Sequence, residues 1–333
     1  MSINFRVLGE PFGDNALFAE VDSGEMRRHL LFDCGGGCLN AFRPSEIMVI
    51  DHLCFSHFHL DHIAGFDRFL RMNYNRESNP VRVWGPEGAA DIIGHRLQGV
   101  SWDLIGDSPT VWRVTDIAAD SLYPTEFYAR EEFRRPHPME SKQFDSAIID
   151  ESSFTVHAVH LSHRTPSIAY YVEEPPRWNI DKNALDTLQL QPGEWLEEVK
   201  DFSRDDAEKI ESGGKERTLG ELREILLRKK EGATIAYVTD CVFEGESTEK
   251  LVRLIAGVDT LICESTYAAE DEELAAQNYH LTSKQAAEIA RQSDAGQLVL
   301  IHMSERYQDQ GPEYLRDQAS DIFENTVLPE AWE

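Results

Sequence analysis

The sequence has no hydrophobic run as long as a membrane-spanning helix requires, which is about 18 residues. Its first residues also lack the basic segment followed by an apolar one that is typical of a secretory signal. We therefore expect a soluble protein of the cytoplasm. The 333 residues, 41% of them hydrophobic, can bury a large core in one big domain or in two ordinary ones.

Cysteine is too scarce for a disulfide framework. The number of cysteines is odd, and most of them lie in apolar, strand-like segments, which favours reduced and buried thiols. The spacing of Cys34 and Cys38 suggests a metal site, but no second pair accompanies them, so we do not expect thiolate ligands. The five cysteines are Cys34, Cys38, Cys54, Cys241 and Cys263.

Basic residues are few for a protein that binds nucleic acid. The 32 Lys and Arg residues stand against 60 Asp and Glu residues, which gives a net charge of −28 at pH 7. Nucleic-acid binding depends largely on Lys and Arg side chains that neutralise phosphates. If RNA is the substrate, a local basic patch has to outweigh the acidic surface at distances below a Debye length. The candidates, each also explained as an ordinary surface charge, are Arg27, Arg28, Arg68, Arg71 and Arg76.

A phosphate-binding loop is absent as well. The glycine run in Asp33-Cys34-Gly35-Gly36-Gly37 lacks the Lys-Ser/Thr pair of a P-loop and the glycine spacing of a dinucleotide-binding fingerprint. We interpret this segment as a tight turn whose backbone comes close to another part of the molecule.

What the sequence does contain is a cluster of metal-binding side chains. His57, His59, Asp61 and His62 lie within six residues, directly after an apolar segment. The apolar segment predicts a strand that ends in His57 and His59, whose side chains then point the same way and can hold one metal ion together. Asp61 and His62, in the turn before a helix that begins near Ile63, can hold a second ion. The alternative, histidines satisfied by hydrogen bonds, is weaker because several buried ring nitrogens would need partners.

Hydrophobic periodicity predicts strands that alternate with helices in the first half of the chain, which indicates an α/β arrangement. Four prolines make residues 103–150 an expected insertion of irregular strands and loops, and 175–232 an expected mixed segment with many acidic residues. The expected strands are 4–8, 16–21, 29–32, 81–84, 153–161, 168–173, 234–239, 261–263 and 297–301. The expected helices are about 85–97, 182–188, 219–228 and 283–291.

Further polar residues follow these strands at their ends. His163, Asp240, Glu264 and His302 each come directly after or at the end of an apolar segment, as His57 and His59 do. Such residues, collected at one edge of a packed sheet, make a site. His160 lies among apolar residues and is better explained as a hydrogen-bonded core histidine, although it remains the alternative to His163.

These residues resemble the metallo-β-lactamase superfamily and, within it, the ribonuclease Z family. The resemblance extends from about Leu30 to Tyr307. It implies an α+β/α/β fold in which two mixed sheets pack between outer helices, a four-layer αββα sandwich that forms a single domain over residues 1–333. The matching segments are Leu31-Phe32-Asp33-Cys34-Gly35, Trp84-Gly85-Pro86, His163 with Pro166-Ser167-Ile168-Ala169-Tyr170, Glu264-Ser265-Thr266-Tyr267, His280-Leu281-Thr282 and His302-Met303-Ser304-Glu305-Arg306-Tyr307.

The resemblance also implies which residues act. One zinc ion would be held by His57, His59 and His163, the other by Asp61, His62 and His302, and Asp240 would bridge them. Imidazole and carboxylate ligands suit Zn²⁺, with Mn²⁺ or another divalent ion as an alternative. Two metals lower the pKa of a shared water and neutralise a phosphodiester under attack. Asp61 would take the proton of that water, and His280, oriented by Glu264, would protonate the leaving 3′-oxygen. Arg306 would contact a phosphate oxygen, or else hold its loop by a salt bridge.

Three functions are open at this point. The first is an endonuclease that cleaves tRNA precursors at the 3′ end, with a homodimer expected by analogy. The second is a dizinc hydrolase of a small phosphodiester such as a cyclic nucleotide, which needs no basic surface. The third is a non-catalytic binding protein that metals stabilise, and it leaves the pair of His280 and Glu264 without a purpose.

Overall fold

The computed structural model describes residues 3–24 and 26–332, and they divide into two compact units. The main unit comprises the chain up to Glu173 and from Ala233 onward, and the inserted unit is Glu174–Gly232. No helix among the described residues is both long and apolar enough to cross a membrane.

The first sheet of the main unit contains strands from the N-terminal half of the chain. The strand order is β1-β2-β3-β4-β5-β6-β7-β8, with β9 paired to β7. The strands from β3 to β6 are parallel, and the others in this sheet are antiparallel to their neighbours. The strands are β1 (Ile3–Leu8), β2 (Ala16–Asp22), β3 (Arg27–Phe32), β4 (His52–Cys54), β5 (Val81–Pro86), β6 (Val111–Ile117), β7 (Ser121–Tyr128), β8 (His137–Pro138) and β9 (Lys142–Gln143).

The second sheet has the order β10-β11-β12-β17-β18-β19-β20, and its last four strands are parallel. Parallel strands present their carboxyl ends at one edge of the sheet. The residues that follow β17, β18 and β19 therefore lie near one another. The strands are β10 (Ala147–Glu151), β11 (Phe154–Leu161), β12 (Ser167–Glu173), β17 (Thr234–Val238), β18 (Thr260–Glu264), β19 (Gln297–Ile301) and β20 (Thr326–Val327).

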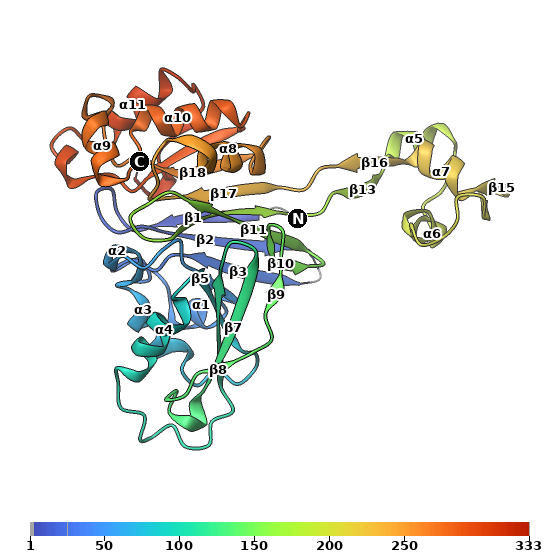
Figure 1. The fold of residues 1–333 in the computed structure, drawn as a ribbon. Coiled ribbons are helices and arrows are strands. Elements are labelled where there is room, and N and C mark those ends of the chain that lie inside the picture. Colours follow the sequence, from blue (N-terminus) through green and yellow to red (C-terminus); the bar gives the residue numbers. More distant parts are fainter. Residues whose placement is uncertain (1–2, 25, 333) are drawn as a thin grey trace. The chain divides into compact units, whose positions relative to one another are not determined.

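Side chains that alternate along the strands build three apolar layers in the main unit. Phe32 and Tyr237 belong to the core between the two sheets, whereas Leu31 and Leu261 point outward to the helices. The helices α1, α3 and α4 cover the first sheet, and α8, α10 and α11 cover the second (Figure 1). The expected four-layer αββα sandwich is thus confirmed.

The helices of the main unit are short. Thr282 and Gln285 form a capping box at the start of α10, close to the expected helix start. The α-helices are α1 (Pro44–Met48), α2 (Leu60–Ile63), α3 (Phe66–Asn73), α4 (Ala89–Gln98), α8 (Gly245–Leu254), α9 (Glu272–Asn278), α10 (Ser283–Gln292) and α11 (Glu313–Ser320). The 3₁₀ turns are η1 (Ala129–Glu131), η2 (Ala269–Asp271), η3 (Glu305–Tyr307) and η4 (Glu330–Trp332).

Residues 103–150 are more regular than their prolines suggest, because β6 and β7 are full members of the first sheet. The expectation of irregular structure holds only around these strands. Pro124 is tolerated within β7, since its carbonyl accepts a hydrogen bond from the N–H of Met139 at 2.8 Å. In a strand the backbone nitrogen and carbonyl of one residue point to the same side. The nitrogen of Pro124, which has no hydrogen to donate, therefore faces the short β8 and not β6.

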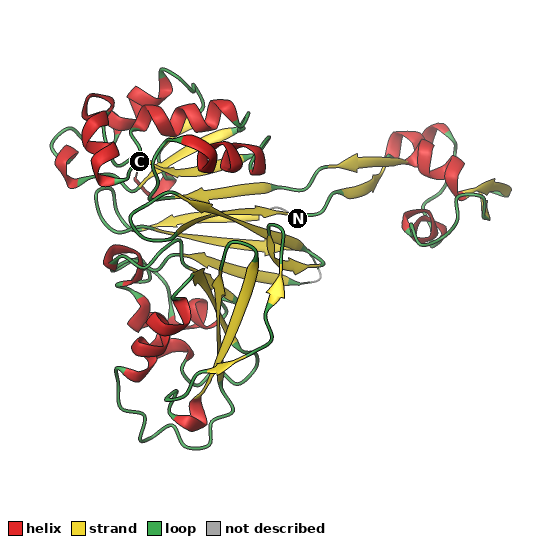
Figure 2. Ribbon diagram, in the orientation of Figure 1, coloured by secondary structure: helices red, strands yellow, loops and turns green. Residues whose placement is uncertain are grey.

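The inserted unit has a hydrophobic core of its own, in which Val199, Leu219, Leu222 and Leu226 are fully buried. The acidic residues of the expected mixed segment include Glu197 and Glu198 on α6, a helix whose bounds the sequence did not predict and which buries Val199. Figure 2 shows its mixture of helices and two-stranded ribbons. The elements are β13 (Arg177–Ile180), α5 (Lys182–Thr187), α6 (Trp195–Lys200), β14 (Lys209–Ser212), β15 (Lys215–Thr218), α7 (Leu219–Leu226) and β16 (Leu227–Lys230).

Candidate metal centre

The loop that carries the first histidines is not a continuation of the strand before it. β4 ends at Cys54, and the N–H of Ser56 donates to Oδ1 of Asp33 at 2.7 Å, so it leaves the sheet ladder. His59 is the N-cap of α2, which begins three residues earlier than expected. His57 and His59 nevertheless lie together, with ring centroids 4.5 Å apart.

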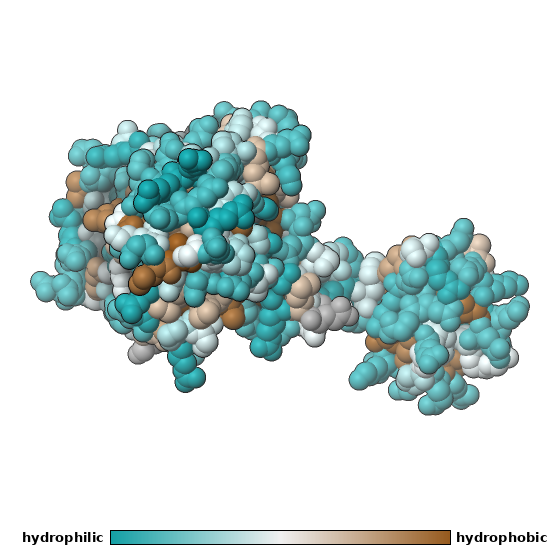
Figure 3. Space-filling model, turned by 90° about the horizontal axis from the view of Figure 1, so that it is seen from below, coloured by the Kyte–Doolittle hydropathy of each residue, from teal (hydrophilic) through white to brown (hydrophobic). Residues whose placement is uncertain are grey.

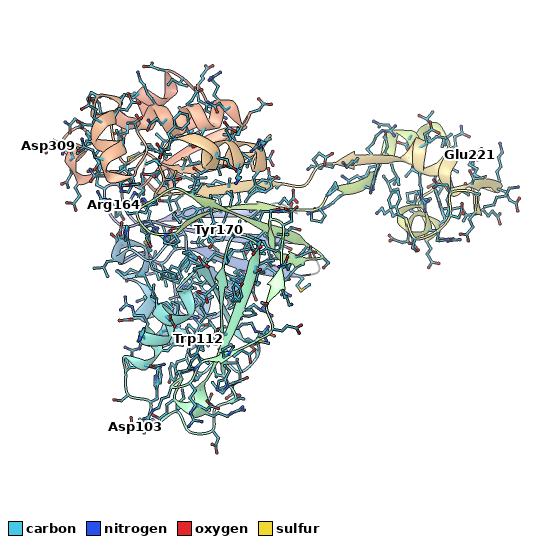
Figure 4. The ribbon with its side chains drawn as sticks, in the orientation of Figure 1. Asp103, Trp112, Arg164, Tyr170, Glu221 and Asp309 are labelled. Atoms are coloured by element: carbon cyan, nitrogen blue, oxygen red, sulfur yellow. The ribbon has the colours of Figure 1, made fainter. Side chains whose placement is uncertain are left out.

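Hydrogen bonds from β12 hold this loop in place. The N–H of Ile168 donates to the carbonyl of Ser56 at 2.9 Å, and the hydroxyl of Tyr170 donates to the carbonyl of Phe55 at 2.7 Å. Tyr170, labelled in Figure 4, is almost fully buried. The backbone directly before His57 is therefore fixed by contacts that do not involve a metal ion.

The remaining candidate ligands come from three strand ends. His163 follows β11, Asp240 follows β17 and His302 follows β19 directly. Asp240 and His302 have left-handed backbones, with φ of +49° and +54°. Such backbone strain is concentrated at functional sites, where the surrounding structure maintains it.

These side chains gather into two clusters that meet at one carboxylate. The Oδ2 atom of Asp240 lies 3.5 Å from Nε2 of His57 and 3.8 Å from Nε2 of His163. Its other oxygen, Oδ1, lies 3.3 Å from Nε2 of His62 and 3.6 Å from Nε2 of His302. The first cluster consists of His57, His59, His163 and Asp240, and the second consists of Asp61, His62 and His302. Within each cluster the donor atoms lie within 4.8 Å of one another.

The donor set fits metal ions better than it fits protein partners. The Nε2 atoms of His57 and His62 are buried and have no hydrogen-bond partner among the described residues. A buried polar atom without a partner costs free energy, and a cation between these rings and Asp240 would remove that cost. No cysteine belongs to the clusters of described residues, in line with the expected nitrogen and oxygen ligands.

A second layer of contacts holds the rings by their other nitrogen. Nδ1 of His62 lies 2.8 Å from Oδ2 of Asp33, and Nδ1 of His302 lies 3.1 Å from Oγ1 of Thr266. Nδ1 of His163 lies 3.0 Å from the carbonyl oxygen of Tyr279. Contacts of this kind fix the tautomer and leave Nε2 free as a ligand.

The electrostatics of the site favour an ionised Asp240 and a neutral His57. Burial opposes protonation of His62 and His302, but the nearby carboxylates, Asp240 foremost, outweigh it and raise the pKa of both rings. Burial opposes ionisation of Asp240, but the neighbouring His302, His62 and His57 outweigh it and hold the pKa of Asp240 well below its usual range. Burial, assisted by repulsion from His62, lowers the pKa of His57 to about 2. A neutral imidazole is the form that binds a metal ion.

The pair of His280 and Glu264 lies beside the clusters, and His280 forms a further group of possible metal-binding side chains with Asp240 and His302. Nδ1 of His280 is 2.9 Å from Oε2 of Glu264 and 3.7 Å from Oδ2 of Asp240. Burial opposes protonation of His280, yet the charge and hydrogen bond of Glu264 raise its pKa to about 9. In the absence of bound cations His280 therefore carries a proton at neutral pH.

Arg306 lies in η3, on the segment that follows His302, and its side chain is exposed. It forms no salt bridge within 3–24 and 26–332, so the alternative role of holding the loop by an ion pair finds no support there. His160 is not part of either cluster, because its Nε2 lies 3.0 Å from the carbonyl oxygen of Ala118.

Not all of the arginines considered for a local basic patch are available at the surface. Arg76 is buried and donates to the carbonyl of Ile50, while Arg27 and Arg28 pair with Asp22 and Glu151. Arg68 and Arg71 are exposed without an ion pair to a described residue, and Arg27 is exposed as well, although it is paired. Hydrophilic side chains cover most of the face in Figure 3.

Sequence reasoning missed several residues that position the site. Asp33 was assigned only to a turn, although a carboxylate at the end of a strand and before glycines is itself a sign of a residue that positions a site. Thr266 lies in the matching segment from Glu264 to Tyr267 but had no role. Asn15 accepts a hydrogen bond from the N–H of His302 at 2.8 Å across 287 positions, and nothing in the sequence indicates this contact.

Comparison with known proteins shows the family to which the chain belongs. A family profile described as "Beta-lactamase superfamily domain" matches residues 212–303, and one described as "Anti-Pycsar protein Apyc1" matches residues 7–164. Ribonuclease Z of Deinococcus radiodurans is 39% identical over 330 residues, which cover 99% of this chain and 98% of that protein. The chain belongs to the ribonuclease Z family. It is a metal-dependent hydrolase, an endoribonuclease of the metallo-β-lactamase fold.

More distant relatives agree with this assignment. Ribonuclease Z of Prochlorococcus marinus is 31% identical over 313 residues, covering 90% of this chain and 85% of that protein. The short form of human tRNase Z is similar in structure, with a TM-score of 0.54, 19% identity and coverage of 99% of this chain and 96% of that one. YhfI of Bacillus subtilis has a TM-score of 0.55 at 17% identity, covering 97% and 94%. At these identities the two structures show the shared fold.

Proposed function

We propose that this ribonuclease Z family member cleaves tRNA precursors at the 3′ end with two bound zinc ions. One ion would be held by His57, His59 and His163, and the other by Asp61, His62 and His302. The observation that carries the proposal is the position of Asp240, whose two oxygens each face two imidazoles of a different cluster at 3.3 to 3.8 Å. A single carboxylate placed in this way suits two cations.

Two divalent cations at these positions would lower the pKa of a shared water and neutralise charge on the phosphodiester. Asp61 would accept the proton of the attacking water. Its Oδ2 lies 3.3 Å from Nε2 of His302 and 3.4 Å from Nε2 of His62, and its side chain is 45% exposed. Burial opposes its ionisation, but the two imidazoles outweigh burial and lower the pKa of Asp61. The carboxylate is therefore ionised and accessible.

His280 would protonate the leaving 3′-oxygen as the bond from phosphorus to that oxygen breaks. Its pKa of about 9 means that the proton is present at neutral pH. Repulsion from bound cations would lower this value toward the pH at which the enzyme works, which is where a general acid is most effective. The hydrogen bond to Glu264 keeps the ring oriented through its Nδ1 atom.

Arg306 would bind a phosphate oxygen of the RNA, since its guanidinium is exposed and unpaired within the described ranges. The local positive charge of the metals and of this residue would oppose the repulsion of a chain with a net charge of −28. We further propose a homodimer that acts in the cytoplasm, where the five unpaired, buried cysteines would stay reduced. Analytical ultracentrifugation tests the dimer.

The experiment compares two substrates at several salt concentrations. The zinc-loaded protein is given a tRNA precursor with a 3′ trailer and, separately, bis(p-nitrophenyl) phosphate. Cleavage of the precursor should weaken steeply with salt, because RNA binding involves several phosphates, whereas hydrolysis of the small ester should respond little. Hydrolysis of the ester without any cleavage of the precursor would contradict the proposal and direct the search to small phosphodiesters such as cyclic nucleotides.

A further inference from the structure

Tyr279 has a backbone conformation that a tyrosine rarely adopts. It is the C-cap of α9, with φ of +63° and ψ of +44°, in the left-handed region. Its N–H donates to the carbonyl of Ala276 at 3.2 Å and so ends the helix. Glycine is the usual residue at such helix ends, because a bulky side chain is strained there. A strained residue beside a functional site calls for a functional explanation.

The backbone of Tyr279 has a role that does not need its ring. The carbonyl oxygen of Tyr279 lies 3.0 Å from Nδ1 of His163 and orients that ligand. A glycine at this position would supply the same carbonyl in the same conformation without strain. The presence of a tyrosine therefore needs a separate reason.

The ring of Tyr279 lies at the surface beside the metal ligands. The residue is 39% exposed, and its ring centroid is 6.2 Å from that of His163, with the two planes nearly perpendicular at 88°. The phenol hydroxyl makes no hydrogen bond with a residue of the ranges 3–24 and 26–332. The hydroxyl does not explain why the ring is there.

Arg164 supports the ring from the loop after β11, where Figure 4 labels it. The guanidinium carbon of Arg164 lies 5.5 Å from the ring centroid of Tyr279, and its Nη2 donates to the carbonyl of Gln277 at 2.9 Å. A cation held over one face polarises the ring and restricts its motion. Leu60, between the candidate ligands His59 and Asp61, is 71% exposed. The surroundings of the metal ligands thus offer apolar surface as well as charge.

We propose that the ring of Tyr279 stacks on a nucleobase next to the scissile phosphate. The proposal rests on the proposed function, since it needs an RNA substrate. Aromatic side chains bind unstacked bases of single-stranded RNA without a strong sequence preference, because every base has a π-face. The ring would place the flanking nucleotide and let the site favour a nucleotide chain over a phosphodiester that lacks bases.

The test combines a change in the protein with a change in the RNA. Tyr279→Gly keeps the carbonyl and relieves the backbone, and an abasic ribose replaces the nucleotide on the 5′ or the 3′ side of the cleaved bond. On the intact precursor the variant should lose about tenfold or more in kcat/KM, the effect of one lost base stack. On one of the two abasic precursors the kcat/KM values of the variant and the wild type should agree within about twofold, because the base on which Tyr279 stacks is already missing.

Controls separate stacking from structure. Tyr279→Phe should behave as the wild type, and Tyr279→Asn, which also accepts left-handed backbone, should behave as the glycine variant. Zinc content should be unchanged in all three, and the unfolding midpoint should not fall in any of them. An equal loss on the intact and both abasic precursors would overturn the inference and assign the effect to the orientation of His163. A wild type that leaves the precursor uncut would refute the proposed function, and the inference would fall with it.

Discussion

The Oδ2 atom of Asp33 lies 2.8 Å from Nδ1 of His62, and the same oxygen accepts hydrogen bonds from the hydroxyls of Ser56 and Tyr237 at 2.7 and 2.9 Å. Asp33 is completely buried and has a left-handed backbone, with φ of +59°. One carboxylate thus joins the loop before the first candidate ligands, a strand of the second sheet and the ring of a ligand.

Replacing Asp33 by Asn should weaken metal binding while preserving the fold. Asn has the same size and tolerates left-handed backbone, but its amide places a donor among groups that donate to Asp33. Loss of a contact that orients a ligand typically lowers metal affinity by about 10- to 100-fold. Competition with a zinc chelator measures the affinity, and circular dichroism checks the fold. Unchanged affinity in a folded variant would show that His62 is oriented without Asp33.

His280→Ala should lower the rate on the precursor by about a hundredfold or more, because the leaving oxygen loses its proton donor. Zinc content should stay the same, since all the proposed ligands are retained. A scaffold that uses metals only for stability would have no activity to lose. Full activity of the variant would remove His280 from the mechanism.

Glu264→Gln should move the alkaline limb of the pH–rate profile. Glu264 is the main group that raises the pKa of His280 to about 9, so its neutral replacement should lower that pKa. A lower pKa means that His280 loses its proton at lower pH, and the rate should fall at a lower pH than in the wild type. Profiles of kcat for both proteins give the comparison. A limb that stays in place would assign it to another group.

Arg306→Ala should reduce the salt dependence of RNA binding. If the guanidinium neutralises one phosphate, its removal should lower the slope of log affinity against log salt by about one. Arg291→Ala is the matched control, because Arg291 is also exposed but pairs with Glu288 on α10. The control should keep the wild-type slope. Equal slopes for all three proteins would mean that Arg306 does not bind a phosphate.

A group of three residues outside the two metal-binding clusters should make stability depend on pH. Glu151 of the second sheet accepts a hydrogen bond from Arg28 at 2.7 Å and lies 3.4 Å from Nε2 of His52, both in the first sheet. The contact with His52 lowers the pKa of Glu151 most, burial raises it, and Arg28 lowers it further. The net effect is a pKa that falls from 4.5 to about 2. A carboxyl group whose pKa is lower in the folded protein than in the unfolded chain stabilises the protein at pH values above the unfolded pKa. That contribution disappears as the pH falls from 4.5 to about 2.

Urea unfolding of Glu151→Gln and of the wild type tests this expectation. The wild type should be more stable near neutral pH, and the difference should shrink as the medium is acidified below the unfolded pKa. Glu249→Gln, at an exposed position of α8 without a salt bridge to any residue that the structure describes, is the control and should show little difference at any pH. A difference that is constant with pH would contradict the pKa assignment.

The sequence predicted β17, β18 and β19 almost to the residue, because their β-branched and apolar runs are buried on both faces. Asp240, Glu264 and His302 were recognised because they are polar residues at the ends of these apolar runs. The end of β4 was less predictable, since it depends on Asp33, which takes the N–H of Ser56 from 23 positions away. Long-range side-chain contacts of this kind leave no local pattern.

The position of Tyr279 shows another limit of the sequence. Its neighbour His280 was identified from the motif with Leu281 and Thr282, but a tyrosine gives no sign of left-handed backbone. Only the end of α9, together with the contact to His163, makes that conformation necessary. In the inserted unit the bounds of α6 were not predicted, because a solvated helix and a solvated loop rich in acidic residues have the same composition.

The most direct test of the central claim is to map the end that the zinc-loaded enzyme leaves on a tRNA precursor with a 3′ trailer. Sequencing of the products should give one cut after the acceptor stem, with a 3′-hydroxyl on the tRNA, and Asp240→Ala should give none because both clusters lose their shared carboxylate. Cuts scattered along the RNA, or the same cut by the variant, would contradict a dizinc endonuclease specific for the 3′ end.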